Sequence, residues 1–273
     1  RVPCMQLVLH PAMLVAFTTP WMRMSLLPHT QRAAVAPQCG IIADFCVSRL
    51  HFSEVQADKA ERRLQHRAAS MDWDTSSAVC DALQSRLGLS EHQVQRVVMA
   101  QPSVLGYSYD RCIAPKLMAL QKRLALSDEQ LCRIVDMMPA VLCYSFASKI
   151  APSLGNMQAR LGLSDLELRK MVLRCPALLG YGFHSKLEPM LAGLQARLEL
   201  SDLELKAIVV ALPSVLSLSL EANLLPKLDF LQLELALSDD TLRERVLRLP
   251  ATLGYSQDRR YRPRIEACRN VAV

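Results

Sequence analysis

Hydrophobic and polar positions along the chain recur with a period of 37 residues. In each unit a serine precedes acidic and amide residues, and apolar residues follow at helical spacing, as in Leu131, Ile134, Val135 and Met138. The serines occupy one position of five successive units: Ser90, Ser127, Ser164, Ser201 and Ser238. A sustained repeat of this length predicts a solenoid, because one helix pair cannot bury its own apolar stripe and neighbouring pairs must stack.

Each serine is predicted to cap the first helix of its unit. An acidic residue follows it in every unit, and four units place Gln93, Gln130, Glu167 or Glu204 three residues after it, which is the pattern of a capping box. The fifth unit has Thr241 there. A proline then ends the helix and opens a short turn, expected to be 3₁₀, at Pro102, Pro139, Pro176, Pro213 and Pro250.

A second helix is predicted to begin near Asp110, Ser148, Ser185 or Asp258, with a further proline in its first turn. These prolines also keep the period, at Pro115, Pro152, Pro189, Pro226 and Pro263. Residues 49–54 align with residues 86–91 and indicate a degenerate N-terminal unit. The pattern therefore predicts an all-α helical-repeat solenoid of five clear 37-residue units, each with two α-helices and a short 3₁₀ turn, preceded by that degenerate unit.

Composition separates the repeats from a leader. Hydrophobic residues make up 51% and charged residues 21% of the 273 residues, which excludes wholesale disorder. The prolines outside the two repeat positions all lie in residues 1–37, and residues 1–43 contain three arginines and no Asp or Glu. This composition predicts an organellar targeting leader over 1–43, the alternative being an ordinary disordered terminus, and a repeat domain over 44–273. Because the chain starts at Arg1, we expect that it is a fragment.

Candidate chemistry is sparse. The nine cysteines include no CxxC pair, and no histidine stands at ligand spacing to a cysteine pair, so we expect free thiols and neither metal nor cofactor. Carboxylate pairs, phosphate-binding glycine loops and nucleophile–base groupings are also missing, so no enzymatic activity is expected. No stretch of about 18 apolar residues is free of proline and charge, which argues against a membrane span.

Basic residues keep the repeat register in the second helices, and the formal charge of +6 is compatible with a polyanionic partner. A ladder of arginines precedes the inter-unit link, with Glu234 at its fifth position, and further lysines and arginines lie upstream on the same helices and near the C-terminus. We predict nucleic-acid contacts for Arg86, Lys116, Arg123, Lys149, Arg160, Lys186, Arg197, Lys227, Arg259, Arg260 and Arg264.

A structural role is the alternative for the arginine ladder, since an arginine at a helix C-terminus complements the dipole and covers apolar surface with its stem. The first-helix pairs Asp165–Arg169, Asp202–Lys206 and Asp239–Arg243 are spaced i,i+4 and are expected to form a solvated face. The recurring tyrosines are expected to pack rather than to stack on bases, because Leu218 replaces them in the fourth unit; they are Tyr107, Tyr144, Tyr181 and Tyr255.

The segments Pro102–Ser108 (PSVLGYS) and Pro250–Ser256 (PATLGYS), followed by the later proline of each unit, carry a family resemblance. The pattern resembles the mitochondrial transcription termination factor (mTERF) family over about residues 86–266, and more weakly over 49–85. The resemblance implies a curved solenoid whose basic groove binds double-stranded DNA or RNA, the absence of catalysis, and a location in mitochondria or chloroplasts. We expect the chain to be a monomer.

Two functions follow as hypotheses. The first is an organellar nucleic-acid-binding protein that regulates transcription termination, initiation or another step of organelle gene expression. The second, suggested by the weak net charge of the repeats, is a protein-interaction scaffold in an organellar ribosome or transcription complex. Binding that weakens steeply with salt would favour the first, because phosphate contacts release counterions.

Overall fold

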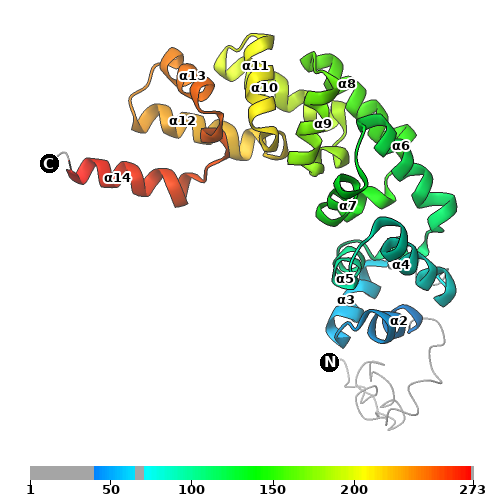
Figure 1. The fold of residues 1–273 in the computed structure, drawn as a ribbon. Coiled ribbons are helices and arrows are strands. Elements are labelled where there is room, and N and C mark those ends of the chain that lie inside the picture. Colours follow the sequence, from blue (N-terminus) through cyan, green and yellow to red (C-terminus); the bar gives the residue numbers. More distant parts are fainter. Residues whose placement is uncertain (1–39, 65–70, 272–273) are drawn as a thin grey trace, which may run out of the picture.

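The computed structural model describes residues 40–64 and 71–271, and these form a curved array of stacked helix pairs without a β-strand. Figure 1 shows the array as an open arc, with the N-terminal helices at one end and α14 at the other. The predicted all-α solenoid is therefore confirmed. Most of the predicted leader, residues 1–39, lies outside the described residues.

The helices follow the predicted units. The first helices are α3 (Glu54–Leu64), α5 (Glu91–Ala100), α7 (Asp128–Met137), α9 (Asp165–Arg174), α11 (Asp202–Ala211) and α13 (Asp239–Arg248). The second helices are α4 (Trp73–Leu87), α6 (Ala114–Leu124), α8 (Ala151–Leu161), α10 (Glu188–Leu198), α12 (Leu225–Glu234) and α14 (Arg262–Val271). The degenerate unit thus consists of α3 and α4, and α2 (Ile41–Leu50) precedes it.

Capping starts the first helices as the sequence predicts. Ser90, Ser127, Ser164 and Ser201 each accept a hydrogen bond from the backbone N–H three residues on, and the Gln or Glu there bonds back to the serine N–H. In the fifth unit the Ser238 hydroxyl accepts from the Thr241 N–H. These bonds satisfy backbone donors that a helix leaves without partners, each contributing about 1 kcal/mol.

Each second helix leads into the next unit through one residue in the left-handed conformation. Gly88 and Gly162 have φ of 67° and 57°, and the residues at the same repeat position are His51, Ala125, Glu199 and Ala236, with φ of 48° to 54°. Their backbone makes the sharp turn that sends the chain into the following serine cap. Glycine adopts this conformation without strain, whereas a residue with a Cβ does so at a cost.

The proline that ends each first helix opens a five-residue 3₁₀ turn, as predicted: η3 (Pro102–Gly106), η5 (Pro139–Cys143), η7 (Pro176–Gly180), η9 (Pro213–Ser217) and η11 (Pro250–Gly254). The second helix differs from the prediction, because a π-helical turn precedes its α-helical part. These turns are η4 (Tyr109–Ile113), η6 (Phe146–Ile150), η8 (Phe183–Leu187), η10 (Leu220–Leu224) and η12 (Gln257–Tyr261).

The second proline of each unit explains the π turn. Pro115 lacks an N–H, so the ordinary i→i−4 ladder is interrupted where it enters α6. The wider turn accommodates the gap, and Ile113 N–H bonds to the Ser108 carbonyl five residues back. Ser108 also caps the turn by accepting from Arg111 N–H. The second helix thus starts, with its π turn, one to two residues earlier than the sequence indicated.

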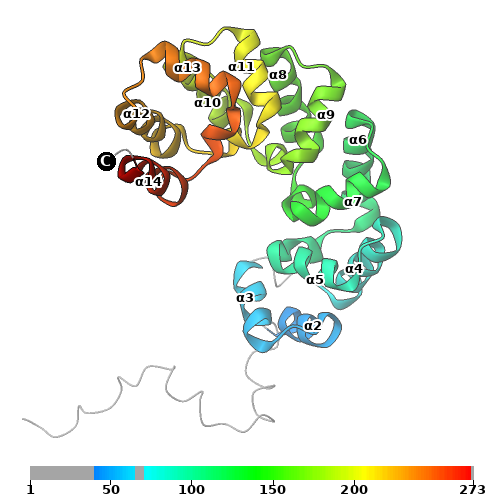
Figure 2. The same cartoon turned by 60° about the vertical axis from the view of Figure 1, so that its left-hand side comes forward.

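The core runs along the arc between the two rows of helices. In α6 the apolar residues at helical spacing are buried, with Leu117 and Leu120 exposed by 3% and 1%. A fully buried leucine contributes about 2 kcal/mol, and every unit repeats such residues. In Figures 1 and 2, α5 and α7 lie toward the hollow of the arc and α4 and α6 behind them. At the other end α12 and α14 lie on the hollow side of α13 in Figure 1, so the rows rotate along the superhelix.

Candidate nucleic-acid interface

The arginine ladder lies between units rather than free in solvent. Arg160, at the end of α8, donates through Nη2 to Gln195 Oε1 at 2.6 Å and through Nη1 to Asp202 Oδ1 at 3.2 Å. Its Nε donates to Glu188 Oε1 at 3.3 Å, and its side chain is 25% exposed. One guanidinium therefore joins the end of its own unit to the second helix of the next unit and to the first helix beyond.

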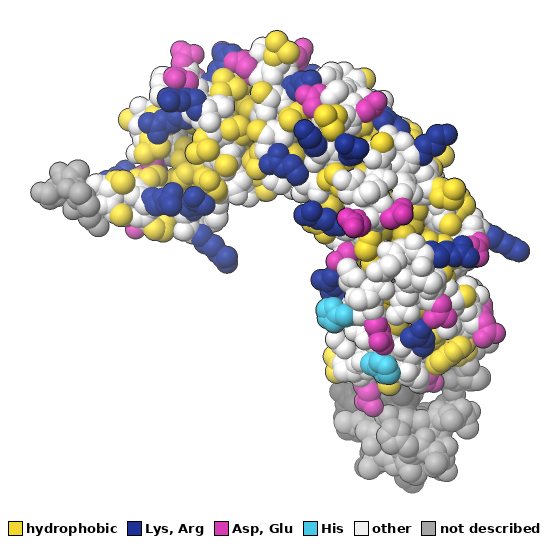
Figure 3. Space-filling model, in the orientation of Figure 1, with side chains coloured by type: hydrophobic (Ala, Val, Ile, Leu, Met, Phe, Trp, Pro, Cys, Tyr) yellow, Lys and Arg dark blue, Asp and Glu magenta, His cyan; other side chains and the backbone are white. Residues whose placement is uncertain are grey.

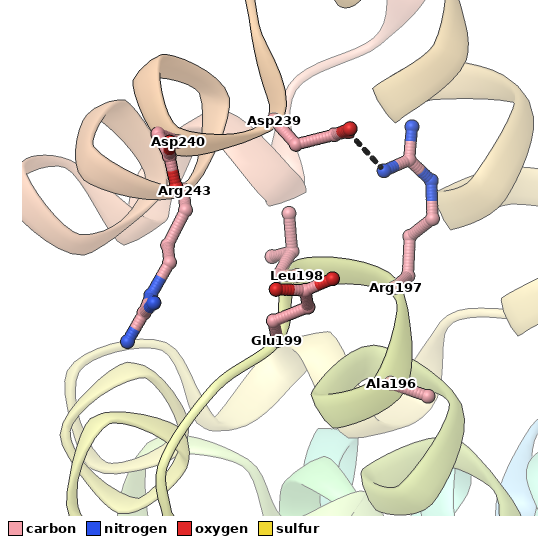
Figure 4. A pocket seen from close by; sticks show the side chains of 7 residues that line it. All are labelled: Ala196, Arg197, Leu198, Glu199, Asp239, Asp240 and Arg243. Atoms are coloured by element: carbon pink, nitrogen blue, oxygen red, sulfur yellow. Dashed lines mark hydrogen bonds and ion pairs between the residues drawn. The ribbon is translucent and has the colours of Figure 1, made fainter.

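The same contacts recur at the neighbouring ladder positions. Arg197 bonds to Gln232 at 2.6 Å and to Asp239 at 3.3 Å, and Figure 4 shows it reaching toward Asp239 across the gap between units. Arg123 bonds to Gln158 and to Asp165 in the same way. Hydrogen bonds from Gln158 and then Arg123 lower the pKa of the Asp165 carboxyl. These three arginines hold successive units together.

Arg86 makes a different contact. Its Nη1 pairs with Asp110 of the following π turn, and its guanidinium lies 5.3 Å from the centre of the Tyr109 ring. Arg86 is 56% exposed at its side chain, more than the ladder arginines that follow. Solvent screening weakens an ion pair of this kind, so Arg86 retains capacity for another partner.

The lysines at the start of the second helices cover tyrosine rings. Lys149 Nζ lies 3.5 Å from the centre of the Tyr144 ring, and Lys186 Nζ lies 3.9 Å from that of Tyr181. Arg260 repeats the pairing at 3.6 Å from Tyr255, and in the first unit Lys116, from another repeat position, lies 5.0 Å from Tyr107. In the fourth unit Leu218 and Asn223 replace ring and cation together. The tyrosine faces are thus occupied by cations of the same chain.

Lys227 lies in the interior, unlike an exposed phosphate contact. It is 4% exposed, and its ammonium donates to Leu253 O at 2.6 Å and to Asn223 Oδ1 at 2.9 Å. Burial lowers its pKa. The charge stays inside because it satisfies a carbonyl of the next 3₁₀ turn, and a phosphate outside cannot reach it. A nucleic-acid contact at Lys227 requires an accessible ammonium, and this buried side chain does not provide one.

The C-terminal arginines stand at the surface. Arg259, Arg260 and Arg264 are exposed, and Arg259 and Arg264 have no carboxylate partner among the described residues. They belong to η12 and α14, at the end of the arc where second helices lie on the hollow side (Figure 1). Their neighbour Arg262 is paired with Asp258 at 3.0 Å.

The expectation that the i,i+4 pairs of the first helices form a solvated face is wrong. Lys206 Nζ lies 3.0 Å from Glu167 of the preceding unit, and Arg243 Nη2 lies 2.6 Å from Glu204. Arg169 donates instead to the Ala125 carbonyl at 3.0 Å. All three basic side chains reach back across a unit boundary, because they lie on the side of the helix that faces the preceding unit rather than on its outward face.

Sequence reasoning missed a second series of cations on the outward face of the first helices. Lys59, Arg96, Arg133 and Lys170 are exposed and stand six residues after the cap serine in four successive units. Arg96 pairs with Asp136 at 2.6 Å, whereas Lys59, Arg133 and Lys170 have no ion-pair partner among the described residues. The 37-residue spacing was the available signal, but spacing alone does not distinguish outward from inter-unit positions.

The position of this series matches the curvature of the arc. Its members lie on α3, α5, α7 and α9, and α5 and α7 face the hollow. Figure 3 shows Lys and Arg side chains along the inner rim of the arc from the level of α5 to that of α9, and again over α14. The cationic path of the hollow thus has two stretches, one over the first helices up to α9 and one over α14, since the equivalent positions of α11 and α13 hold Ala207 and Glu244.

Other chemistry is limited in the part of the chain that the structure describes. Residues 40–64 and 71–271 contain no group of three His, Cys, Asp or Glu side chains placed to hold a metal ion. Within the same residues no helix is long and apolar enough to cross a membrane.

Residues 68–201 match the model of the mTERF family, and no curated protein sequence matches the chain. The matched segment runs from the second helix of the degenerate unit through three clear repeats. Proteins of this family are typically organellar and bind nucleic acids as regulators of gene expression rather than as enzymes. The match over residues 68–201 and the repeated helix–3₁₀–helix units support the assignment of the chain to the mTERF family.

Proposed function

We propose that the protein binds a nucleic-acid duplex along the hollow of the arc and thereby regulates transcription termination, initiation or another step of gene expression in a mitochondrion or chloroplast. The observation that carries this proposal is the pair Arg133 and Lys170. Both are exposed, neither has an ion-pair partner among the described residues, and they occupy one repeat position on successive first helices. The match to the mTERF family model supports the same class of ligand.

The spacing of these cations suits a phosphate backbone. Packed helices lie about 8–10 Å apart, so side chains at one repeat position form a row with that spacing. A regular row neutralises successive phosphates without reading bases, as backbone contacts do in most complexes. Arg259, Arg260 and Arg264 extend the contact at the other end of the arc, and Arg86 adds an exposed guanidinium near its start.

The covered tyrosine rings favour a duplex over a single strand. Proteins that bind single strands offer aromatic faces on which bases stack. Here the faces of Tyr144, Tyr181 and Tyr255 are occupied by Lys149, Lys186 and Arg260. Arg123, Arg160 and Arg197 support the interface by holding units in register, since their donors are engaged within the protein.

The test is binding by the purified chain, followed by fluorescence anisotropy. Labelled duplex DNA, duplex RNA and single-stranded DNA of equal length are titrated at several salt concentrations. We expect the duplexes to bind more tightly than the single strand, with log affinity falling linearly against log salt by about 0.9 per phosphate contact. Absence of duplex binding at low salt, or binding that salt does not affect, would contradict the proposal. The better of the two duplexes identifies DNA or RNA as the target.

A protein-interaction scaffold is the second candidate, and exposed leucines favour it. Leu166 and Leu203 stand at one repeat position of α9 and α11 and are 49% and 79% exposed. Apolar side chains repeated on one outward face are typical of partner surfaces. A stable complex with one organellar ribosomal or transcription protein that survives nuclease treatment, and that Leu203→Glu abolishes, would support this candidate in place of the first.

A further inference from the structure

A groove of about 330 Å³ lies between α3 and α5, the first helices of the degenerate unit and of the first clear unit. Lys59 and Arg63 of α3 line it together with Arg96 of α5. His51, His92, Gln56 and Gln95 complete the polar part of the wall, and no Asp or Glu is among the lining residues. Three permanent positive charges and two imidazoles therefore surround one small volume.

Glu91 lies 3.6 Å from His51 Nε2 and takes up part of this charge, but the other nearby carboxylates leave most donors available. Asp136 takes only Nη2 of Arg96, and Arg96 Nε and Nη1 have no partner in the described part of the chain. Arg63 donates through Nη1 to the Met99 carbonyl at 2.8 Å, which orients the guanidinium, and its Nη2 has no partner among residues 40–64 and 71–271. Lys59 has no ion-pair partner among the described residues, because Asp58 pairs with Arg62 at 3.4 Å.

The concentration of cations is specific to this gap and does not follow from the repeat. One unit further along, between α5 and α7, the position of Arg63 holds Ala100 and that of His92 holds Glu129. The position of His51 holds Gly88. The second gap thus has two basic side chains and an acidic one where the first has five basic or imidazole groups.

Convergent guanidinium and ammonium donors recognise phosphate, whose oxygens accept several charge-assisted hydrogen bonds at once. Imidazoles add further N–H donors. Phe52, exposed by only 7%, provides an apolar floor that lowers the local dielectric and strengthens such bonds.

We infer that the groove between α3 and α5 binds a single phosphate group. The inference rests on the proposed function only where that phosphate belongs to the bound nucleic acid. In that case the groove anchors one backbone phosphate at the N-terminal end of the cationic path, next to the row that continues through Arg133. A small phosphate compound presents the same chemistry to the same donors.

Inorganic phosphate is the probe for the pocket itself. Backbone amide shifts of the ¹⁵N-labelled chain are followed during titration with sodium phosphate, against sodium chloride at matched ionic strength. The test variant is Lys59→Gln with His92→Gln, which leaves the guanidiniums of Arg63 and Arg96 in their structural contacts. The matched control is Arg133→Gln, at the same repeat position as Lys59 and outside the groove. Circular dichroism checks that both variants retain the fold.

We expect saturable shifts confined to the groove in the wild type and in Arg133→Gln. The double variant should bind phosphate about tenfold more weakly, the loss of one to two charge-assisted hydrogen bonds. Shifts no larger with phosphate than with chloride, or equal affinity in the double variant, would overturn the pocket.

A duplex-binding arm separates the two sources of the phosphate. Weaker duplex affinity in the double variant, together with competition by inorganic phosphate beyond that of chloride, assigns the groove to the nucleic-acid backbone; Lys122→Gln is the control. Unchanged duplex affinity with an intact phosphate titration assigns it to a separate phosphate compound. If the wild type binds no duplex, the proposed function fails while the phosphate titration still decides the pocket.

Discussion

Glu234 accepts a hydrogen bond from Arg269 Nη2 at 2.8 Å, across the boundary between α12 and α14. The two residues stand at the repeat positions that hold arginine and glutamine in preceding units, as in Arg160 and Gln195. The ladder that the sequence indicated is therefore not broken at Glu234, its fifth position. It keeps the contact between the same two positions and reverses its polarity.

Reversing this pair tests whether the contact itself stabilises the arc. Glu234→Arg places two arginines side by side and should lower the free energy of unfolding by roughly 0.5 kcal/mol, a small value because Arg269 is 62% exposed. Adding Arg269→Gln recreates the pairing of the other units and should recover that loss. Urea unfolding of both single variants and the double variant gives the coupling energy, and purely additive effects would contradict a direct contact.

Removal of a ladder arginine should affect stability first. Arg160→Ala deletes the bonds to Gln195 and Asp202 and leaves Glu188 without its cation, so we expect a loss of about 2 kcal/mol in the free energy of unfolding. Arg133→Ala is the control and should change stability little, because Arg133 is exposed and has no ion-pair partner within the described part of the chain. Chemical denaturation measures both. If the two variants were equally stable, Arg160 would not hold the units together and would again be a candidate phosphate contact.

Charge reversal on the outward face should affect binding without loss of fold. Arg133→Glu with Lys170→Glu should weaken duplex affinity at low salt by more than about tenfold and reduce the salt slope by about 2, the value for two phosphate contacts. Lys122→Glu is the matched control, since Lys122 is exposed on α6 in the row behind α7. Anisotropy titrations at several salt concentrations measure both quantities. Equal weakening in the control would indicate a general charge effect instead of a defined face.

Acid should destabilise the arc through the capping glutamates. Bonds from Ser164 and Lys206 lower the pKa of Glu167 to about 2, and bonds from Ser201 and Arg243 lower that of Glu204 to about 2, from an ordinary 4.5. Because the folded pKa lies below the unfolded one, this contribution is complete above about pH 4.5 and is lost as pH falls toward 2.

Glu204→Gln isolates the charge from the cap, because Gln93 and Gln130 form the same capping box in other units. We expect a lower Tm than the wild type at pH 7 and a smaller decrease between pH 5 and pH 2. Calorimetry across this range measures both. A decrease as large as that of the wild type would show that acid sensitivity has another origin.

The left-handed link allows a stabilising substitution. Ala125 has φ of 48° and is exposed, so Ala125→Gly removes Cβ strain without loss of a buried contact and should raise the free energy of unfolding by about 1 kcal/mol. Gly162→Ala, at the same position with φ of 57°, should lower it by a similar amount. Thermal unfolding of both variants tests the pair, and shifts of the same sign would refute the argument.

Local features of the sequence predict most of the fold, because they act within one unit. The cap serines, the terminating prolines and the apolar stripe of α6 require only neighbouring residues, and all lie where the spacing indicates. The π turn before α6 was missed, since the proline in the second helix is compatible with a helix start as well as with an interrupted ladder.

The candidate interface depended on how units stack. Arg160 meets Gln195 and Asp202 only when residues 35 and 42 positions apart come together, and Lys227 is buried only because the next 3₁₀ turn covers it. The same stacking of units leaves Arg133 exposed on the outward face of α7. A period of 37 residues defines which side chains are equivalent, whereas the packing of one unit on the next decides whether an equivalent cation joins two units or faces solvent along the hollow of the arc.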